Sequence, residues 1–253
     1  MKRIALYAFF AAAVVAAFPA LAAEDRLVIA GGGVAGRWNT EFKLANVSTE
    51  PVDATLSIGG LPLGVPCPPN CTTESFRIPG GGTILIDATQ FIGEMYVGPQ
   101  IVTVETAGDA PLPIVHARSF SSDSTCQFAE LPVIRESTIK AMDPPVLVFP
   151  GVTRGGGSYT NLILESLSDT ATSVEVELRD SEGQILGTAT FPVPGRVTGA
   201  ALTLVDVAAH FGVETIENGQ VRVRNLTATG PVWGVLATVG AEGSLEVAIG
   251  ANP

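Results

Sequence analysis

The 253-residue sequence predicts an all-β protein made of two tandem antiparallel β-sandwiches. Three observations lead to this class: short segments of alternating apolar and polar residues, Gly-, Pro-, Asn- and Ser-rich clusters between them, and an internal repeat. Gly and Pro are abundant, with 28 and 18 residues, and only 15% of the residues are charged. About seven or eight short strands per unit are typical of an immunoglobulin-like sandwich.

Residues 1–22 are predicted to form a secretory signal peptide. Lys2 and Arg3 provide the positive start, an uncharged apolar run follows, and Ala20-Leu21-Ala22 supplies small residues before the cleavage site. The apolar run is short for a membrane span, and no later run is long enough, so we expect no span after the signal is removed. The Ala-rich run is typical of bacteria, and we expect export to the periplasm, the cell surface or the medium.

The chain repeats itself at a distance of about 120 residues. Residues 40–44 align with residues 160–164 at this shift, and Ile78-Pro79-Gly80 aligns with Val193-Pro194-Gly195 at a shift of 115. Further pairs at the longer shift are Gly31 with Gly151, Ser48 with Ser168, Val115 with Val235, and Ala117 with Ala237. The repeat predicts two copies of one sandwich.

The predicted units cover residues 23–140 and 146–253, with a linker at 141–145. Asp143-Pro144-Pro145 cannot continue a helix or a central strand, which favours a short stiff connection. Ser137-Thr138-Ile139-Lys140 matches the S-x-x-K motif of penicillin-recognising enzymes, but the S-D-N and K-T-G partners do not occur in the sequence. We therefore interpret these four residues as polar linker.

Strict alternation over residues 173–179 predicts a half-buried strand. Its polar face carries Glu175 and Glu177, a pair that could serve a glycosidase. Alternation favours a solvated face instead, with these carboxylates opposite Arg222 and Arg224 of a neighbouring strand.

One short helical turn is expected in each unit, near residues 88–92 and near residues 207–211. Asp206 is the expected N-cap of the second turn, and Gly212 is its expected stop.

The glycine-rich segment at residues 31–36 matches G-x-G-x-x-G and follows an apolar run. A dinucleotide site needs a helix directly after this motif. Residues 37–44 predict a strand, so we interpret the glycines as a loop and expect no cofactor.

The charge balance disfavours nucleic acid as a partner. The chain has 14 Lys and Arg against 25 Asp and Glu, for a formal net charge of −11, whereas binding to phosphate requires clustered cations. The two histidines, His116 and His210, are far apart and lack neighbouring ligands, so no metal site and no catalytic residue is predicted.

Three cysteines offer one disulfide in an oxidising compartment. We predict that Cys67 and Cys71 pair across their Pro-rich loop. The alternative, in which Cys126 pairs with Cys67 or with Cys71, stays open.

Trp38 and Tyr159 stand at nearly equivalent positions, where the second strand of each unit begins. These rings are candidate ligand-contact aromatics, because sugar-binding modules present exposed aromatic platforms. The alternative is that they plug the open end of each sandwich.

The order of the motifs resembles a β-sandwich repeat of exported bacterial proteins of unassigned function. The residues that carry the resemblance are 159–164, 194–195, 204–206, 219–223 and 231–232. The resemblance implies the tandem architecture and brings no catalytic residues.

The function predicted from these observations is that of a non-catalytic, exported structural or adhesive interaction protein, with a protein or a surface polysaccharide as partner. The alternative is a carbohydrate-binding module. A third hypothesis, a hydrolase, would require a pocket with converging carboxylates or His116.

Overall fold

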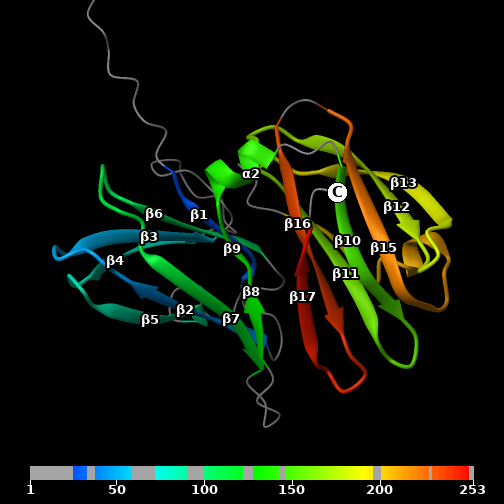
Figure 1. Ribbon diagram of the computed structural model, residues 1–253, viewed down its shortest axis with the longest axis horizontal. Helices are drawn as coiled ribbons and strands as arrows, with labels where there is room; N and C mark the ends of the chain where they lie inside the picture. The colour runs from blue at the N-terminus through cyan, green and yellow to red at the C-terminus, as the bar shows by residue number, and fades with distance from the viewer. Residues whose placement is uncertain are drawn as a thin grey trace, which may run out of the picture.

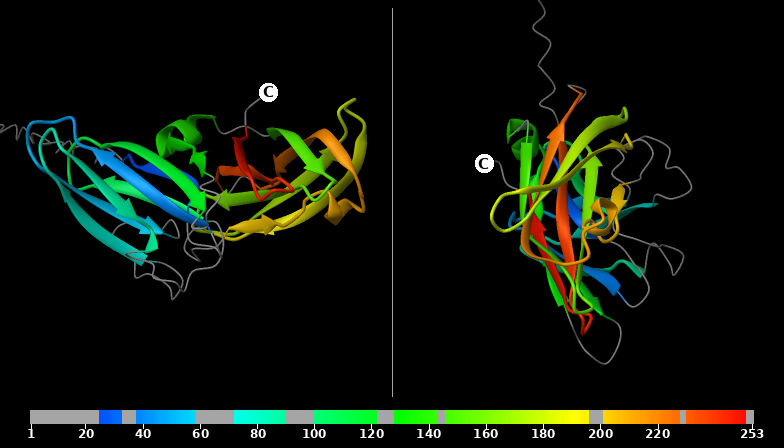
Figure 2. Two further views of the ribbon diagram at one scale, coloured as in Figure 1. Left: turned by 90° about the horizontal axis from the view of Figure 1, so that it is seen from below. Right: turned by 90° about the vertical axis from the view of Figure 1, so that its right-hand side faces the viewer.

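The computed structural model describes residues 25–32, 38–58, 72–89, 100–121, 128–142, 146–195, 201–227 and 230–250. Four antiparallel sheets form two sandwiches (Figure 1). The view from below in Figure 2 shows the two sandwiches following one another along the long axis of the molecule. The predicted all-β class is confirmed.

The first sandwich contains the sheets β4-β3-β6-β1-β9 and β5-β2-β7-β8. Its strands are β1 (Leu27–Gly32), β2 (Trp38–Ala45), β3 (Val52–Ile58), β4 (Thr72–Ile78), β5 (Thr83–Asp87), β6 (Gln100–Thr106), β7 (Ile114–Ser121), β8 (Phe128–Leu131) and β9 (Val133–Arg135). The helix α2 (Glu136–Met142) follows β9 and leads to the second sandwich.

The second sandwich repeats this arrangement with the sheets β10-β15-β12-β13 and β14-β11-β16-β17. Its elements are β10 (Val146–Arg154), β11 (Tyr159–Ser166), β12 (Thr172–Arg179), β13 (Ile185–Val193), β14 (Leu202–Leu204), the 3-10 turn η3 (Ala209–Phe211), β15 (Ile216–Asn225), β16 (Val232–Val239) and β17 (Leu245–Ile249).

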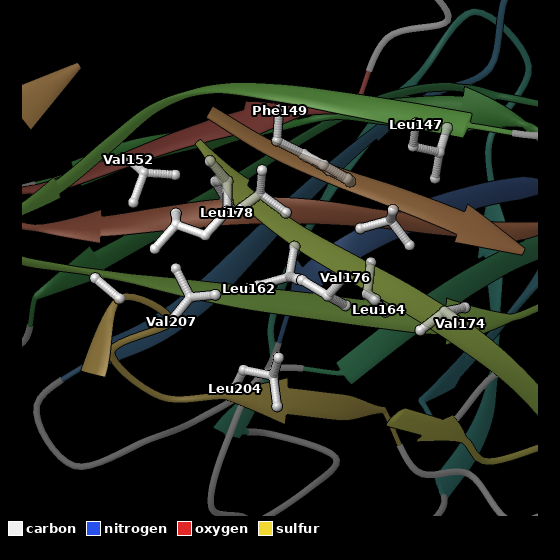
Figure 3. Close-up of a cluster of buried hydrophobic side chains, with 14 of the residues drawn as sticks. Leu147, Phe149, Val152, Leu162, Leu164, Val174, Val176, Leu178, Leu204 and Val207 are labelled. Carbon is white, nitrogen blue, oxygen red and sulfur yellow. The ribbon is translucent and has the colours of Figure 1, made fainter. Parts of the chain in front are cut away.

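Each sandwich has its own apolar core, because alternate residues of facing strands point inward. The first core includes Ile29, Phe42, Leu56, Ile78 and Val104. The second includes Phe149, Leu162, Val176, Val193 and Val223, and Figure 3 shows side chains from both of its sheets. Burying one such side chain contributes about 1.5–3 kcal/mol, so these cores are the main source of stability.

The repeat is visible in the strand registers. Leu27 lies opposite Val104 in the first sandwich, and Leu147 lies opposite Val223 in the second. The backbone N–H of Ala88 donates to Thr40 O, and that of Val207 donates to Thr160 O, both at 2.8 Å.

The Pro-Gly segments also correspond. A Cβ on Gly80 would lie 1.9 Å from Thr49 O, and a Cβ on Gly195 would lie 2.3 Å from Asp169 O. Only glycine allows the loop to approach this closely.

The predicted pairing of Ala117 with Ala237 is wrong by one residue. Thr40 lies opposite Ser119, whereas Thr160 lies opposite Thr238, so the shift at the seventh strand is 119. A slip of one residue moves a side chain to the other face of a sheet. Accordingly, Ala117 belongs to the first core, and Ala237 faces away from the second.

The interpretation of residues 137–140 as polar linker is also wrong. They form the middle of α2, and Ile139 is buried with 2% of its surface exposed. Asp25 holds the start of this helix, because Ser137 N and Oγ donate to its carboxylate at 3.1 and 2.9 Å.

The second helical turn is present as η3, and Gly212 ends it with a φ of 70°, as predicted. Asp206 is not its N-cap, since Ala208 occupies that position. Of the first predicted turn, residues 90–92 lie outside the described residues.

Candidate functional site

The candidate site is the outward surface of the β5-β2-β7-β8 sheet, called here the open face. Phe42, Ile86 and Ala117 point into the core, so their neighbours along each strand point out to solvent. The open face consists of Asn39, Glu41, Lys43, Leu85, Asp87, Ile114, His116, Arg118, Phe120, Phe128 and Glu130.

Ion pairs link the central charges of the open face. Arg118 Nε donates to Glu41 Oε1 at 2.9 Å, and Lys43 Nζ lies 3.7 Å from the same oxygen. His116 Nε2 lies 2.6 Å from Glu130 Oε2, and both of these side chains are about half exposed. The exposed His116–Glu130 pair contributes about 0–1 kcal/mol, so a ligand can compete for it; the Glu41 side chain, at 14% exposed, is more deeply held.

Asp87 is held at one end of the open face. Its Oδ1 accepts hydrogen bonds from Asn39 Nδ2 at 2.7 Å, Thr89 Oγ1 at 2.6 Å and Thr89 N at 2.8 Å. Burial raises the pKa of Asp87, but these hydrogen bonds outweigh burial and hold it below its ordinary value. Asp87 is therefore ionised at neutral pH.

Large apolar side chains are exposed among these charges. Leu85, Ile114 and Phe128 are 58%, 61% and 60% exposed. Phe128 lies directly opposite the half-buried Phe120 in the register of β7 and β8. Exposed aromatic and aliphatic groups rimmed by polar groups are typical of interaction surfaces.

The equivalent face of the second sandwich is covered by protein. Ile163, Trp233 and Val235 point away from the second core and pack with Val28 of β1 and Ile139 of α2. Figure 1 shows β16 beside β1, β9 and α2. This cluster, called here the docking cluster, joins the two sandwiches.

The registers match the two faces residue by residue. Lys43 lies opposite His116, as Ile163 lies opposite Val235. In the open face, three of these positions of the docking cluster carry polar, ionisable side chains: Lys43 in place of Ile163, His116 in place of Val235, and Arg118 in place of Ala237, while Ile114 stands in place of Trp233.

A buried ion cluster of Arg26, Glu105 and Glu136 lies in the first sandwich, close to the docking cluster. Arg26 Nε donates to Glu136 Oε2, and Arg26 Nη1 donates to Glu105 Oε1 at 3.2 Å. Burial lowers the pKa of Arg26, and the charge of Glu105 opposes this effect. The strand β1, the strand β6 and the start of α2 are therefore tied together beside the docking cluster.

The sequence interpretation missed the docking cluster, although β16 carries a signal for it. The segment Val232–Val239 is apolar on both of its sides instead of alternating, which is the pattern of a strand buried on two faces.

The candidate aromatics stand one position apart in the two sandwiches, as the shift of 120 residues predicts. Tyr159 lies opposite Val239, and by register it corresponds to Asn39, whereas Trp38 corresponds to Ser158. Tyr159 is half buried, and the side chain of Trp38 lies outside the described residues.

The predicted disulfide also lies outside the described residues, since these include neither Cys67, Cys71 nor Cys126. Of the glycine-rich segment, Gly31 and Gly32 end β1, and the next described element is β2 instead of a helix.

The predicted charge ladder on the second sandwich is confirmed. Glu175 lies opposite Arg224, and Glu177 lies opposite Arg222. Arg224 Nη1 is 3.4 Å from Glu175 Oε1.

Within the described ranges, no group of three or more His, Cys, Asp or Glu side chains could hold a metal ion. No helix in these ranges is both long and apolar enough to cross a membrane.

Comparison with protein-family models finds no match, and no curated protein matches the chain. The fold defines a class, the tandem β-sandwich proteins.

Proposed function

We propose that the protein is a non-catalytic, exported interaction protein that binds its partner through the open face. One observation carries the proposal: the corresponding face of the second sandwich is a protein-binding surface, because it packs against the first sandwich. In the first sandwich the same face is exposed and combines three large apolar side chains with charged groups.

The composition of the open face suits a partner that binds reversibly. The docking cluster stays buried and is mainly apolar, with one buried carboxylate, Glu165, opposite Trp233, whereas surfaces that form and break contacts expose apolar anchors among polar groups. Phe128 is the proposed anchor; Phe120 lies opposite it, and the next pair along the two strands on the same face is Arg118 with Glu130. The proposed partner is a protein of the periplasm or cell surface.

Export and the family resemblance are part of the same proposal. The signal peptide predicted at residues 1–22 and the resemblance to a β-sandwich repeat of exported bacterial proteins support it. Secretion of the full chain, followed by N-terminal sequencing, is expected to give a mature protein that starts at residue 23.

Carbohydrate binding is the second candidate function, and it is favoured by the cross-strand pair of Phe120 and Phe128 beside Asn39. Aromatic rings next to hydrogen-bonding side chains are a suitable surface for sugars. A hydrolase is a weaker hypothesis, because His116 lies on an exposed sheet face and is engaged by Glu130.

Site-specific photo-cross-linking in the native host tests the proposal. A photo-reactive residue at Phe128 is expected to capture a discrete protein, and the same residue at Val205, which is equally exposed at 59%, is not. Arg118→Ala is expected to weaken the cross-link at Phe128 by about tenfold, which corresponds to about 1.4 kcal/mol.

Equal cross-linking at Phe128 and Val205 would contradict the proposal. A glycan array with purified protein separates the two candidates: binding that is lost in Phe128→Ala supports the carbohydrate function instead.

A further inference from the structure

The second sandwich has an exposed face of its own, the outward surface of the β10-β15-β12-β13 sheet, called here the ladder face. Val176 and Val223 point into the second core, so Glu175, Glu177 and Arg222, which alternate with them, point outward. A hollow of about 60 Å³ opens on the ladder face, and its lining residues are Val146, Glu175, Glu177, Arg179, Arg222 and Arg224. One water needs about 10–15 Å³ of such space, so the hollow has room for a group of a few heavy atoms.

Two of the three guanidinium groups in the hollow are paired with its two carboxylates. Arg179 Nε donates to Glu177 Oε1 at 2.6 Å. Arg224 Nη1 lies 3.4 Å from Glu175 Oε1. The hollow therefore contains one more cation than it contains anions, in a chain whose formal net charge is −11.

Arg222 is the third guanidinium group, and it has no carboxylate partner within the described residues. It lies opposite Glu177 in the register of β12 and β15, but Glu177 is engaged by Arg179 instead. Arg222 Nε donates to Gln220 Oε1 at 3.0 Å, which orients the guanidinium plane. The terminal Nη1 and Nη2 groups of Arg222 are thus left to face a ligand.

The fold does not require charge at these positions. The pair of the first sandwich that corresponds to Glu177 and Arg222 is Ser57 and Thr103, because Leu27 lies opposite Val104 as Leu147 lies opposite Val223. The first sandwich forms with two uncharged side chains at this pair. The charges of the hollow are therefore a feature of the second sandwich alone.

A free guanidinium group selects a particular kind of ligand. Its two terminal nitrogens match the two oxygens of a carboxylate, and such bidentate contacts are stronger and more specific than contacts with a single lysine ammonium. The surplus of one positive charge suits a singly charged group. A phosphate monoester carries about −1.5 to −2 charges at neutral pH and would add excess negative charge beside Glu175 and Glu177.

The carboxylates of the ladder face add a second requirement, since they accept hydrogen bonds from hydroxyl groups. An ionised carboxylate has about four acceptor positions, so Glu175 and Glu177 can accept further hydrogen bonds while they pair with arginine. Thr188 and Thr190 of β13 lie opposite Glu177 and Glu175, and both threonines are exposed. A ligand that lies across these strands meets donors for an anion and acceptors for hydroxyl groups side by side.

These two requirements favour an acidic polysaccharide over an acidic protein segment. A sugar acid carries a carboxylate and several hydroxyl groups on one ring, whereas an aspartate or glutamate side chain carries the carboxylate alone. In addition, the centre of a protein–protein interface is depleted of charged residues, and five of the six residues that line this hollow are charged.

We propose that the hollow of the ladder face binds a carboxylate of an acidic polysaccharide. Arg222 Nη1 and Nη2 donate to the two carboxylate oxygens, and Glu175 and Glu177 accept hydrogen bonds from sugar hydroxyl groups. The proposal goes beyond the open face, which lies on the other sandwich. The protein would hold a protein partner with its first sandwich and a polysaccharide with its second.

Binding of the mature chain to two uronate polymers, polygalacturonate and alginate, tests the proposal in affinity electrophoresis. The wild type is expected to bind at least one of them and to lose binding when that polymer is methyl-esterified, because the ester removes the charge. Arg222→Gln is expected to raise the dissociation constant at least about tenfold. Arg222→Lys keeps the charge but loses the paired donors, so its binding is also expected to be weaker than that of the wild type.

The matched control is Arg77→Gln. Arg77 is an exposed arginine of the first sandwich that lies 3.3 Å from Asp53, so this variant removes the same charge from another part of the surface. It is expected to bind the polymer as the wild type does. Thermal unfolding of each variant checks that both sandwiches remain folded.

Three results would overturn the proposal. The first is a wild type that binds neither uronate polymer. The second is an affinity that Arg222→Gln lowers no more than Arg77→Gln does, or that Arg222→Lys leaves unchanged. The third is equally tight binding of poly-aspartate, which would assign the hollow to acidic peptides instead.

Discussion

Replacing Trp233 tests whether the docking cluster joins the two sandwiches into one stable unit. Trp233 is 1% exposed and packs between the second sandwich and the β1 and α2 elements of the first. Its Nε1 has no hydrogen-bond partner within the described residues. We predict that Trp233→Ala destabilises the whole chain, whereas Trp233→Phe has a small effect.

The magnitude follows from two opposing contributions. Removal of a buried Trp side chain costs about 3–5 kcal/mol. Removal of a buried, unpartnered N–H relieves a desolvation penalty of about 1–3 kcal/mol. The expected net loss for Trp233→Ala is therefore about 2 kcal/mol, and Trp233→Phe is expected to lose less than about 1.5 kcal/mol.

Urea unfolding followed by circular dichroism measures these losses. For a chain of this size, about 2 kcal/mol corresponds to a fall in Tm of about 4–8 °C. The control is Ile114→Ala, because Ile114 holds the position equivalent to Trp233 but is 61% exposed, and its loss is expected within about 0.5 kcal/mol. If Trp233→Ala costs no more than Ile114→Ala, the docking cluster does not hold the sandwiches together.

Two further predictions concern charge. Arg26→Met leaves the buried Glu105 and Glu136 without this cation; we expect a loss of about 3–5 kcal/mol in urea unfolding at neutral pH, and an equally stable variant would contradict the role of the ion cluster. Burial raises the pKa of Asp25, but hydrogen bonds from Ser137 and the neighbouring arginines outweigh it and lower the pKa below its ordinary value. This carboxylate therefore stabilises the fold above the ordinary Asp pKa of about 3.9, and the contribution is lost as the pH falls through its lowered pKa. The free energy of unfolding of Asp25→Asn is therefore expected to fall less steeply in acid than that of the wild type. An equally steep fall in both proteins would contradict this assignment.

The sequence predicted the class of fold because alternation is a local property. Each of Val174, Val176 and Leu178 is inward because the side chains of a strand alternate, whatever the strand pairs with. The Pro-Gly segments near Gly80 and Gly195 were matched for a similar reason, since a close backbone approach excludes every other residue.

The candidate site was less accessible from the sequence. Trp38 and Tyr159 were selected by residue type, but their places in the two sandwiches differ by one position. Ala117 and Ala237 show the same limit, because an alignment without registers cannot detect a slip of one residue that reverses the face. The residues of the open face carry no motif and come together through the pairing of four strands.

The sequence by itself determined that this is an acidic, all-β chain that contains one sandwich twice, because composition and period-two patterns depend only on near neighbours. Only the tertiary structure decided which of two equivalent faces is covered and which is open. That outcome depends on residues far apart in the chain, such as Val28 and Trp233, which belong to the same docking cluster, and Arg26 and Glu136, which form an ion pair beside it. No local pattern encodes such contacts.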